Sequence, residues 1–313
     1  MRSEMNTAID WEGKRRIGGL RRFAFGITLL NLLGHTVFGF EQSWAQPLVA
    51  LAAAYSMELF LEFVDSQAKG RQPRYVGGPR VLFDFILSAH ISGMAVSMLL
   101  YANDRLWVVA FAAATAVASK AIFRAPAGRG YRHLFNPSNF GITVTLLLFP
   151  WVGIAPPYQF TERIFGAGDY ILPAAIILTG SFLNIRFTRK IPLILTWVSC
   201  FALQALVRSF ITGGPALSPL MPMTGVAFIV FTFYMVTDPA TTPSSWKGQI
   251  FFGASVAATY GLLLMGHIVF GLFFSLTIVT AIRGLGLYAN RFLAVEPEPA
   301  KPAVSVTSAA TEV

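Results

Sequence analysis

Long apolar runs, separated by short polar or basic segments, recur from residue 22 to residue 288. Each run has about the length, roughly 20 residues, that an α-helix needs to cross the hydrocarbon core of a bilayer. The pattern therefore predicts an all-α, polytopic integral membrane protein. The ten predicted membrane-spanning helices are 22–40, 46–64, 81–101, 106–123, 137–154, 170–187, 191–210, 219–237, 249–265 and 268–288.

Composition agrees with a membrane protein. Hydrophobic residues make up 55% of the chain, charged residues 12%, and the mean hydropathy is +0.60. Soluble domains carry about 25% charged residues, so a soluble fold is excluded. The net charge of +9 would also suit nucleic acid, but its distribution along the chain favours membrane orientation instead, and we expect no nucleic-acid partner.

The basic residues alternate with the predicted helices. If the N-terminus is cytoplasmic, 21 of the 24 lysines and arginines fall in cytoplasmic segments, and the other three are Arg105, Arg163 and Arg208. Lysine and arginine accumulate on the cytoplasmic side of membrane proteins. We therefore expect both termini to be cytoplasmic and the protein to lie in the inner (plasma) membrane.

The chain divides into a cytoplasmic N-terminal segment (1–21), a membrane domain (22–290) and a disordered cytoplasmic tail rich in Pro, Ala, Ser and Thr (291–313). The first span lacks a small-residue cleavage site, so it is expected to stay as an anchor. The single cysteine, Cys200, lies in an apolar run and excludes an internal disulfide framework.

A polar, basic segment lies before the fifth predicted span. Asn136 is a good helix N-cap, and Pro137 suits the first helical position. The positive end of the helix dipole at this point could hold an anion, a phosphate or a carbonyl, although a plain capped helix start explains the same residues. A basic rim surrounds this helix start, made of Lys120, Arg124, Arg129, Arg132 and His133. Such a rim suits a phosphate-bearing cofactor and equally suits the anionic inner leaflet, and Lys120 alone could simply snorkel.

A second proline-marked corner follows the eighth predicted span, at Thr237, Asp238 and Pro239. Asp238 is expected to start a turn or to cap the next segment. The four residues from Asp238 resemble the four from Asn136, which is a weak indication of an internal duplication. We expect both corners on the cytoplasmic side, forming a shared pocket.

Ionisable groups within spans are candidates for function. Glu58 and Glu62 share one helix face, where they may serve only to stabilise cytoplasmic loops through Arg71 and Arg74. For Asp84, the simplest expectation is a local pair with Arg80. His35 and His90 could ligate haem iron, but hydrogen bonds across helices are the commoner role for such histidines.

At these residues the chain resembles the NqrB/RnfD family of membrane electron-transport subunits. The resemblance covers about 80–288 and rests on Asp84, on Lys120, on the run Phe135 to Gly141, and on Met235 to Pro239. Within that family, Phe135 to Gly141 and Pro156 to Glu162 are most similar to the UnbU branch, which is associated with enediyne and related biosynthesis. The candidate cofactor-binding residues are Lys120, Asn136, Pro137, Ser138, Asn139, Thr237 and Asp238.

The family attaches flavin mononucleotide (FMN) to a threonine in a Ser/Thr-Gly-Ala-Thr motif before the sixth span. Here Gly166 and Ala167 are followed by Gly168, which has no hydroxyl. The resemblance therefore implies FMN or riboflavin bound non-covalently, and we expect no covalent flavin.

Three hypotheses follow for the function. The first is a membrane redox component that binds flavin non-covalently, and the second is a transporter or channel for a small solute or ion. The third is a non-catalytic scaffold for a soluble redox or biosynthetic partner on the cytoplasmic face. We find no nucleophile–base pair, metal-ligand cluster or nucleotide loop in the sequence, so no catalytic centre is named and the question of enzymatic activity stays open.

Overall fold

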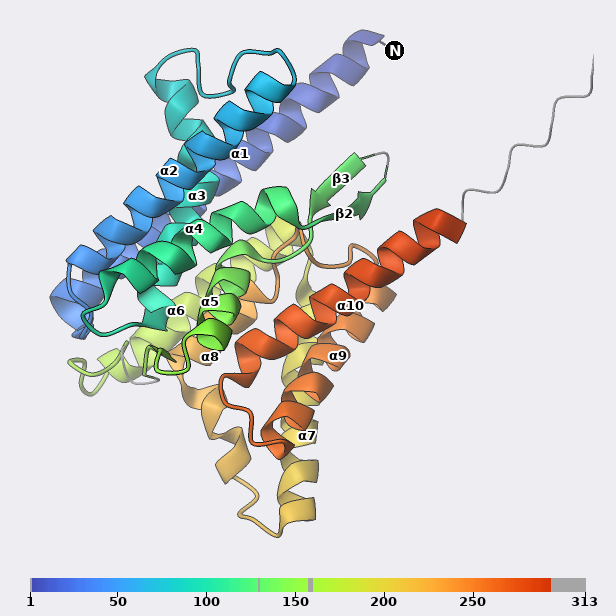
Figure 1. Cartoon of the computed structure of the whole chain (residues 1–313). Helices are drawn as coiled ribbons and strands as arrows, with labels where there is room; N and C mark the ends of the chain where they lie inside the picture. Colours follow the sequence, from blue (N-terminus) through green and yellow to red (C-terminus); the bar gives the residue numbers. More distant parts are fainter. Residues whose placement is uncertain (1, 129, 157–159, 294–313) are drawn as a thin grey trace, which may run out of the picture.

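The structure is a computed structural model that describes residues 2–128, 130–156 and 160–293, with the backbone only for residues 2–16. The predicted tail, 291–313, lies almost entirely outside the described residues. Figure 1 shows a mostly helical chain in which α1 to α4 pack together and α7, α9 and α10 form a second group.

Ten helical segments occupy the predicted positions. Five of the long helices are α2 (Ala45–Ala68), α3 (Pro79–Leu99), α7 (Ile191–Thr212), α9 (Trp246–Met265) and α10 (Gly271–Leu293). The sixth is α6 (Gly168–Leu183), which continues as a π-helical turn, Asn184–Thr188. These six are long and apolar enough to cross a membrane. The protein is therefore a helical, multi-pass membrane protein.

The eighth segment is broken rather than straight. A 3-10 helix, Ser218–Thr224, meets α8 (Val226–Val230) and its π-helical extension, Phe231–Met235, at an angle of 68°. Pro222 and Gly225 lie at the break, where proline cannot continue the hydrogen-bond ladder. Counting this bent pair as one span brings the membrane-spanning candidates to seven among the described residues.

Two apolar helices are shorter: α4 (Leu106–Ile122) and α5 (Pro137–Leu148). The fifth span was predicted to reach residue 154, but α5 ends at Leu148 and is about 18 Å long. The chain then turns through Pro150 into the short strand β4 (Gly153–Ile154).

The first helix, α1 (Arg2–Leu33), runs through the segment 1–21 that the sequence analysis separated from the first span. Arg, Lys, Glu and Ala favour helix, and no proline interrupts this stretch. A π-helical turn, Gly34–Phe38, extends α1 towards α2.

The predicted all-α class misses two small antiparallel pairings. Strand β1 (Leu100–Tyr101) pairs with β4, and β2 (Arg124–Ala127) pairs with β3 (Gly130–His133) in a hairpin between α4 and α5. We call the end of the molecule that carries this hairpin the hairpin end, and the other the opposite end. The connections between segments alternate between the two ends (Figure 1).

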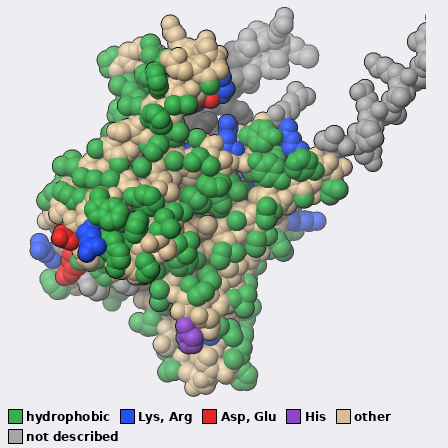
Figure 2. Space-filling model, viewed as in Figure 1, with side chains coloured by type: hydrophobic (Ala, Val, Ile, Leu, Met, Phe, Trp, Pro, Cys, Tyr) green, Lys and Arg blue, Asp and Glu red, His purple; other side chains and the backbone are tan. Residues whose placement is uncertain are grey.

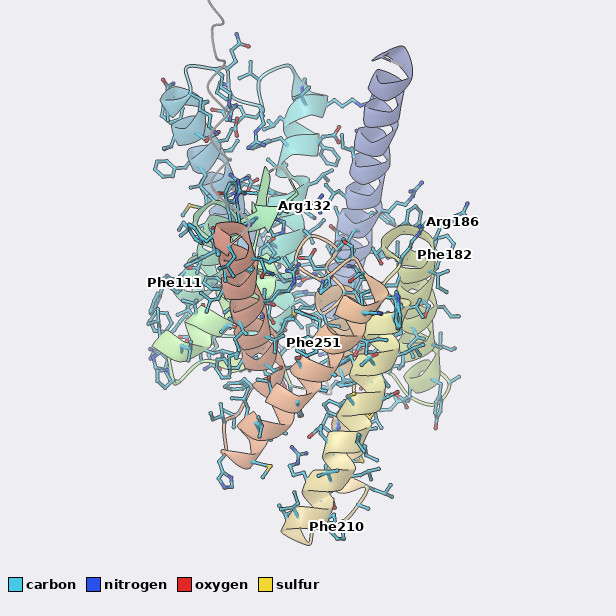
Figure 3. All side chains as sticks on the ribbon, turned by 90° about the vertical axis from the view of Figure 1, so that its right-hand side faces the viewer. Phe111, Arg132, Phe182, Arg186, Phe210 and Phe251 are labelled. Atoms are coloured by element: carbon cyan, nitrogen blue, oxygen red, sulfur yellow. The ribbon has the colours of Figure 1, made fainter. Side chains whose placement is uncertain are left out.

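Hydrogen bonds fix which connections share an end. At the opposite end, Ala155 N–H donates to the Leu99 carbonyl at 2.9 Å, and Arg163 N–H donates to the Phe38 carbonyl at 3.3 Å. Figure 3 shows Arg132 and Arg186 at the hairpin end and Phe210, near the end of α7, far from both.

The two halves of the chain repeat one local design. The Asn31 amide of α1 donates to the carbonyl of Ile27, four residues earlier, and reaches across to Met94 of α3. Asn184, at the end of α6, likewise donates to the carbonyl four residues earlier and across to Phe233 of the bent span. Each half has five helical segments, so the second half begins at the opposite end and runs inverted relative to the first.

Candidate functional site

The start of α5 has the predicted N-cap. The Asn136 side-chain Oδ1 accepts the Asn139 N–H at 3.1 Å and the Ser138 hydroxyl at 2.9 Å, and Pro137 occupies the first helical position. These contacts satisfy amide groups that would otherwise be orphaned at the helix start. Ser138 is therefore bonded within the cap rather than directed to an open pocket.

The two proline-marked corners lie side by side at the hairpin end. The Asn136 Nδ2 donates to the carbonyl of Met235, the last residue of the bent span, at 3.4 Å. Asn184 reaches the same segment at the Phe233 carbonyl, 2.9 Å away. Because a π-helical end leaves carbonyl groups without helical partners, these two amides stabilise it. The two four-residue segments are not equivalent, however, since one begins a helix and the other follows one.

Asn139 faces α10 rather than the corner. Its Nδ2 donates to the Phe273 carbonyl at 3.1 Å and to the Thr277 hydroxyl at 2.8 Å, while Thr143, one turn later, contacts the same two residues. The side chain is 2% exposed. Asn139 thus joins α5 to α10.

The second corner is a compact turn. The Asp238 Oδ1 accepts the Ala240 N–H at 3.0 Å, as expected for a turn-starting aspartate. The Asp238 carbonyl accepts the Thr242 hydroxyl at 2.6 Å. The Thr237 hydroxyl donates to the Phe233 carbonyl at 2.7 Å, four residues back, so it is bonded locally.

Four consecutive carbonyls of this loop are held by side chains from three other segments. The Arg283 guanidinium of α10 donates to the Thr241 carbonyl at 2.8 Å. The Lys190 ammonium, at the start of α7, donates to the carbonyls of Thr242 at 3.4 Å and Pro243 at 2.7 Å. The Gln249 amide of α9 donates to the Ser244 carbonyl at 3.2 Å. We call Lys190, Gln249 and Arg283 the carbonyl clamp.

Lys190 is an unusual cation because its side chain is 2% exposed. Burial lowers the pKa of the ammonium to about 8; Arg283 nearby lowers it further and Asp238 opposes the shift. From the sequence, Lys190 and Arg283 served only as markers of topology. Arg283 was counted as cytoplasmic although the predicted span 268–288 contains it, and an ionisable residue in a span is a signal that could have been used.

Lys120 does not belong to an open basic rim. Its ammonium lies 2.5 Å from the Glu58 carboxylate on α2 and 3.4 Å from the Ser88 hydroxyl on α3. Both ion-pair partners are mostly buried, so the charge of Lys120 is neutralised inside the first half. This contact joins α2, α3 and α4.

The other acidic candidates also have ionic partners. Glu62 is paired with Arg71 and Arg74, both at 2.6 Å, which fits the expected stabilisation of a cytoplasmic loop. The predicted pairing of Asp84 with Arg80 was wrong. The Asp84 carboxylate instead accepts two hydrogen bonds from the Arg21 guanidinium of α1, at 2.8 and 2.7 Å. A bidentate contact to another helix has better geometry than a local pair.

The two histidines have hydrogen-bonding roles. The Tyr55 hydroxyl lies 2.6 Å from His90 Nδ1, and Thr28 lies 2.7 Å from His90 Nε2. Since the Thr28 hydroxyl donates to Ala24, His90 Nε2 carries the hydrogen that Thr28 accepts, and Tyr55 donates to Nδ1. His35 lies 2.9 Å from the Asn31 carbonyl and packs against Phe40 and Trp44.

The candidate cofactor residues do not fit a flavin in this arrangement. Their side chains bond to one another, to neighbouring helices or to the backbone. An enclosed apolar cavity beside Met235, Phe231 and Phe273 has a volume of about 30 Å³. Binding sites for drug-sized ligands measure about 300–1,000 Å³.

Comparison with known proteins gives no relative: no family model matches the chain, and no curated protein matches it. The likeness to the NqrB/RnfD family therefore rests on the residues quoted from the sequence alone.

Proposed function

We propose that the chain crosses the inner (plasma) membrane ten times with both termini in the cytoplasm, the hairpin end being cytoplasmic. The alternation of connections between the two ends supports this topology, as does the excess of basic residues in the described hairpin-end segments over the opposite end, which holds Arg105, Arg163 and Arg208. Short or broken segments such as α5 and the bent span are tolerated at membrane depth where other helices cover them.

Single cysteines in a Cys200→Ser background test this topology. A membrane-impermeant maleimide applied to intact cells should label Asp104→Cys and Ala216→Cys, which lie in opposite-end loops. Gln72→Cys and Lys247→Cys should react only after the membrane is permeabilised. Labelling of all four in intact cells, or of one from each pair, contradicts the ten-crossing arrangement.

We further propose that the protein is an NqrB/RnfD-like component of a membrane redox system. One observation supports this function best: the two segments that carry the resemblance, 135–141 and 235–239, meet through the contact between Asn136 and Met235. Segments about 100 residues apart in the chain thereby form one corner of the molecule, as residues of a shared function would.

Because the corner side chains bond to each other, the redox proposal places no flavin among them. FMN or riboflavin, bound non-covalently, is what the resemblance implies for the whole protein. An absorbance spectrum of the detergent-purified protein tests it directly. Flavin bands that leave with the protein precipitate on denaturation would mean covalent attachment. Flavin released to the supernatant is the expected result, and no flavin even after adding riboflavin or FMN would contradict the proposal.

A transporter for a small solute or ion is the second candidate, and two structural observations favour it. The five-segment halves run in opposite directions, and a broken span lies where they meet; secondary transporters often combine these features. Deleting the gene and measuring solute accumulation in membrane vesicles separates the two functions. Altered accumulation with no bound flavin would favour transport.

A further inference from the structure

The β2–β3 hairpin and the last turns of α10 form one continuous surface. The Tyr288 hydroxyl of α10 donates to the Arg124 carbonyl at 2.5 Å. The Arg291 guanidinium lies 4.8 Å from the centre of the Tyr131 ring, a cation–π contact. Arg124 in turn donates to the Tyr131 carbonyl at 3.1 Å. We call Arg124, Tyr131, Arg132, Tyr288 and Arg291 the basic hairpin surface.

The arginines of this surface are exposed and lack acidic partners. Among the described residues, no carboxylate lies within salt-bridge distance of Arg124, Arg132 or Arg291. The sequence explains why: no Asp or Glu occurs between Asp104 and Glu162, and none between Asp238 and Glu296.

Several other cations at the hairpin end are neutralised by carboxylates within the chain. Arg21 is paired with Asp84, Arg71 with Glu62, and Lys120 with Glu58. The basic hairpin surface thus keeps three positive charges for a partner outside the chain. Its neighbour His133, opposite Arg124 in the hairpin, adds no negative charge.

Apolar side chains border the same surface. Ile122, just before the hairpin, is 67% exposed, and Phe292 and Leu293, just after Arg291, are 76% and 78% exposed. Figure 2 shows basic side chains among hydrophobic ones where Figure 1 places the hairpin. Exposed apolar groups beside arginine and tyrosine are typical of the boundary between hydrocarbon and headgroups.

We propose that the basic hairpin surface binds the phosphate headgroup of anionic phospholipids in the leaflet at the hairpin end. The three arginines supply charge-assisted hydrogen bonds to phosphodiester oxygens. The bordering apolar side chains contact the upper acyl chains, which a soluble anionic partner would not offer. The assignment does not depend on whether the protein carries electrons or a solute.

Native mass spectrometry of the full-length protein tests the proposal. The protein is titrated with phosphatidylglycerol or with zwitterionic phosphatidylcholine, and lipid adducts are counted. The triple variant R124Q/R132Q/R291Q should bind phosphatidylglycerol about a hundredfold more weakly, since each basic residue near an anionic surface contributes about fivefold. R124K/R132K/R291K should keep most of the binding, because the charge is retained.

The matched control is R80Q/R186Q/K247Q, which removes three exposed cations from other hairpin-end segments. It should leave binding within about twofold of wild type.

Equal losses in both triple variants would overturn the proposal, since net charge alone would then explain binding. Unchanged binding in R124Q/R132Q/R291Q would also overturn it and leave the surface for a protein partner. Competition by inorganic phosphate at concentrations matching the lipid would assign the site to free phosphate instead. An unchanged thermal unfolding midpoint excludes misfolding as the cause of a loss.

Discussion

The Lys190 ammonium donates a 2.7 Å hydrogen bond to the Pro243 carbonyl and thereby ties the α6–α7 turn to the loop before α9. A buried cation that contacts only neutral carbonyls has no directly bound counter-ion to offset the cost of burying its charge. The carbonyl clamp is for this reason the part of the corner whose stability should respond most to pH.

The pH dependence of Lys190 has a definite direction. Its pKa is about 8 in the folded protein, against 10.5 for an ordinary lysine. Below about pH 8 both the folded and the unfolded chain hold the proton, so Lys190 contributes no pH dependence to the free energy of unfolding. Between these two pKa values the unfolded chain holds more protons, so the free energy of unfolding rises with pH by up to about 1.4 kcal/mol per unit. Thermal unfolding of wild type and Lys190→Gln from about pH 7.5 to about pH 10 should show this slope in wild type only. Parallel curves would refute the assignment.

The Glu58–Lys120 pair should be strongly non-additive. Removing one partner leaves a buried charge without its counter-ion, so Lys120→Met should cost about 3–5 kcal/mol of unfolding free energy. The double variant E58M/K120M should regain most of that loss. Thermal unfolding of both single variants and the double variant gives the coupling energy. Additive losses would show that the two side chains do not depend on each other.

Asn136 has two separable contacts. Asn136→Asp keeps the oxygen that caps α5 but loses the amide donor to Met235, whereas Asn136→Ala loses both. We therefore expect Asn136→Ala to be less stable than Asn136→Asp by about 1 kcal/mol, the usual contribution of an N-cap. Equal stability of the two variants in chemical unfolding would mean that the cap contributes nothing here.

Gly141 allows α5 to approach α4 closely. A Cβ at this position would lie 2.4 Å from the Ala112 carbonyl oxygen and 2.8 Å from the Ala116 Cβ. Gly141→Ala must therefore separate the two helices, at a cost of about 1–3 kcal/mol. Gly286 in α10 is the matched control, because a Cβ there meets no atom within 4 Å. Gly286→Ala should be neutral or stabilising by less than about 1 kcal/mol. A similar effect of both substitutions on the unfolding midpoint would argue against close packing at Gly141.

Local chemistry predicted the start of one helix, α5. Asn136 and Pro137 predicted the start of α5, whereas the cap of α9, where Ser245 accepts the Gly248 N–H at 3.2 Å, was not predicted. Apolar length predicted where the long helices lie. Apolar length overestimated the length of α5. The residues after Leu148 are also apolar, but the chain turns at Pro150 and the helix does not continue. Apolar composition alone does not distinguish a lipid-facing helix from a turn that leads into a short strand.

Partners distant in sequence could not be predicted. Asp84 lies four residues from Arg80, which made a local pair the simplest expectation, but Arg21 is brought to it by the packing of α1 on α3. Lys120 was assigned to a rim because its neighbours in sequence are basic, whereas Glu58 arrives from α2. The meeting of the two corners was predicted, the hydrogen bonds that occupy their side chains were not, and flavin binding by the protein stays a prediction.

The carbonyl clamp also sets an order of assembly during synthesis. The loop that carries carbonyls 241–244 leaves the ribosome before Gln249 and well before Arg283. The Ser244 carbonyl therefore stays without its partner until α9 has been made, and the Thr241 carbonyl until the final helix, α10, has entered the bilayer. A nascent chain that stops short of α10 therefore holds an unfinished corner, in which the Thr241 carbonyl lacks its cationic partner.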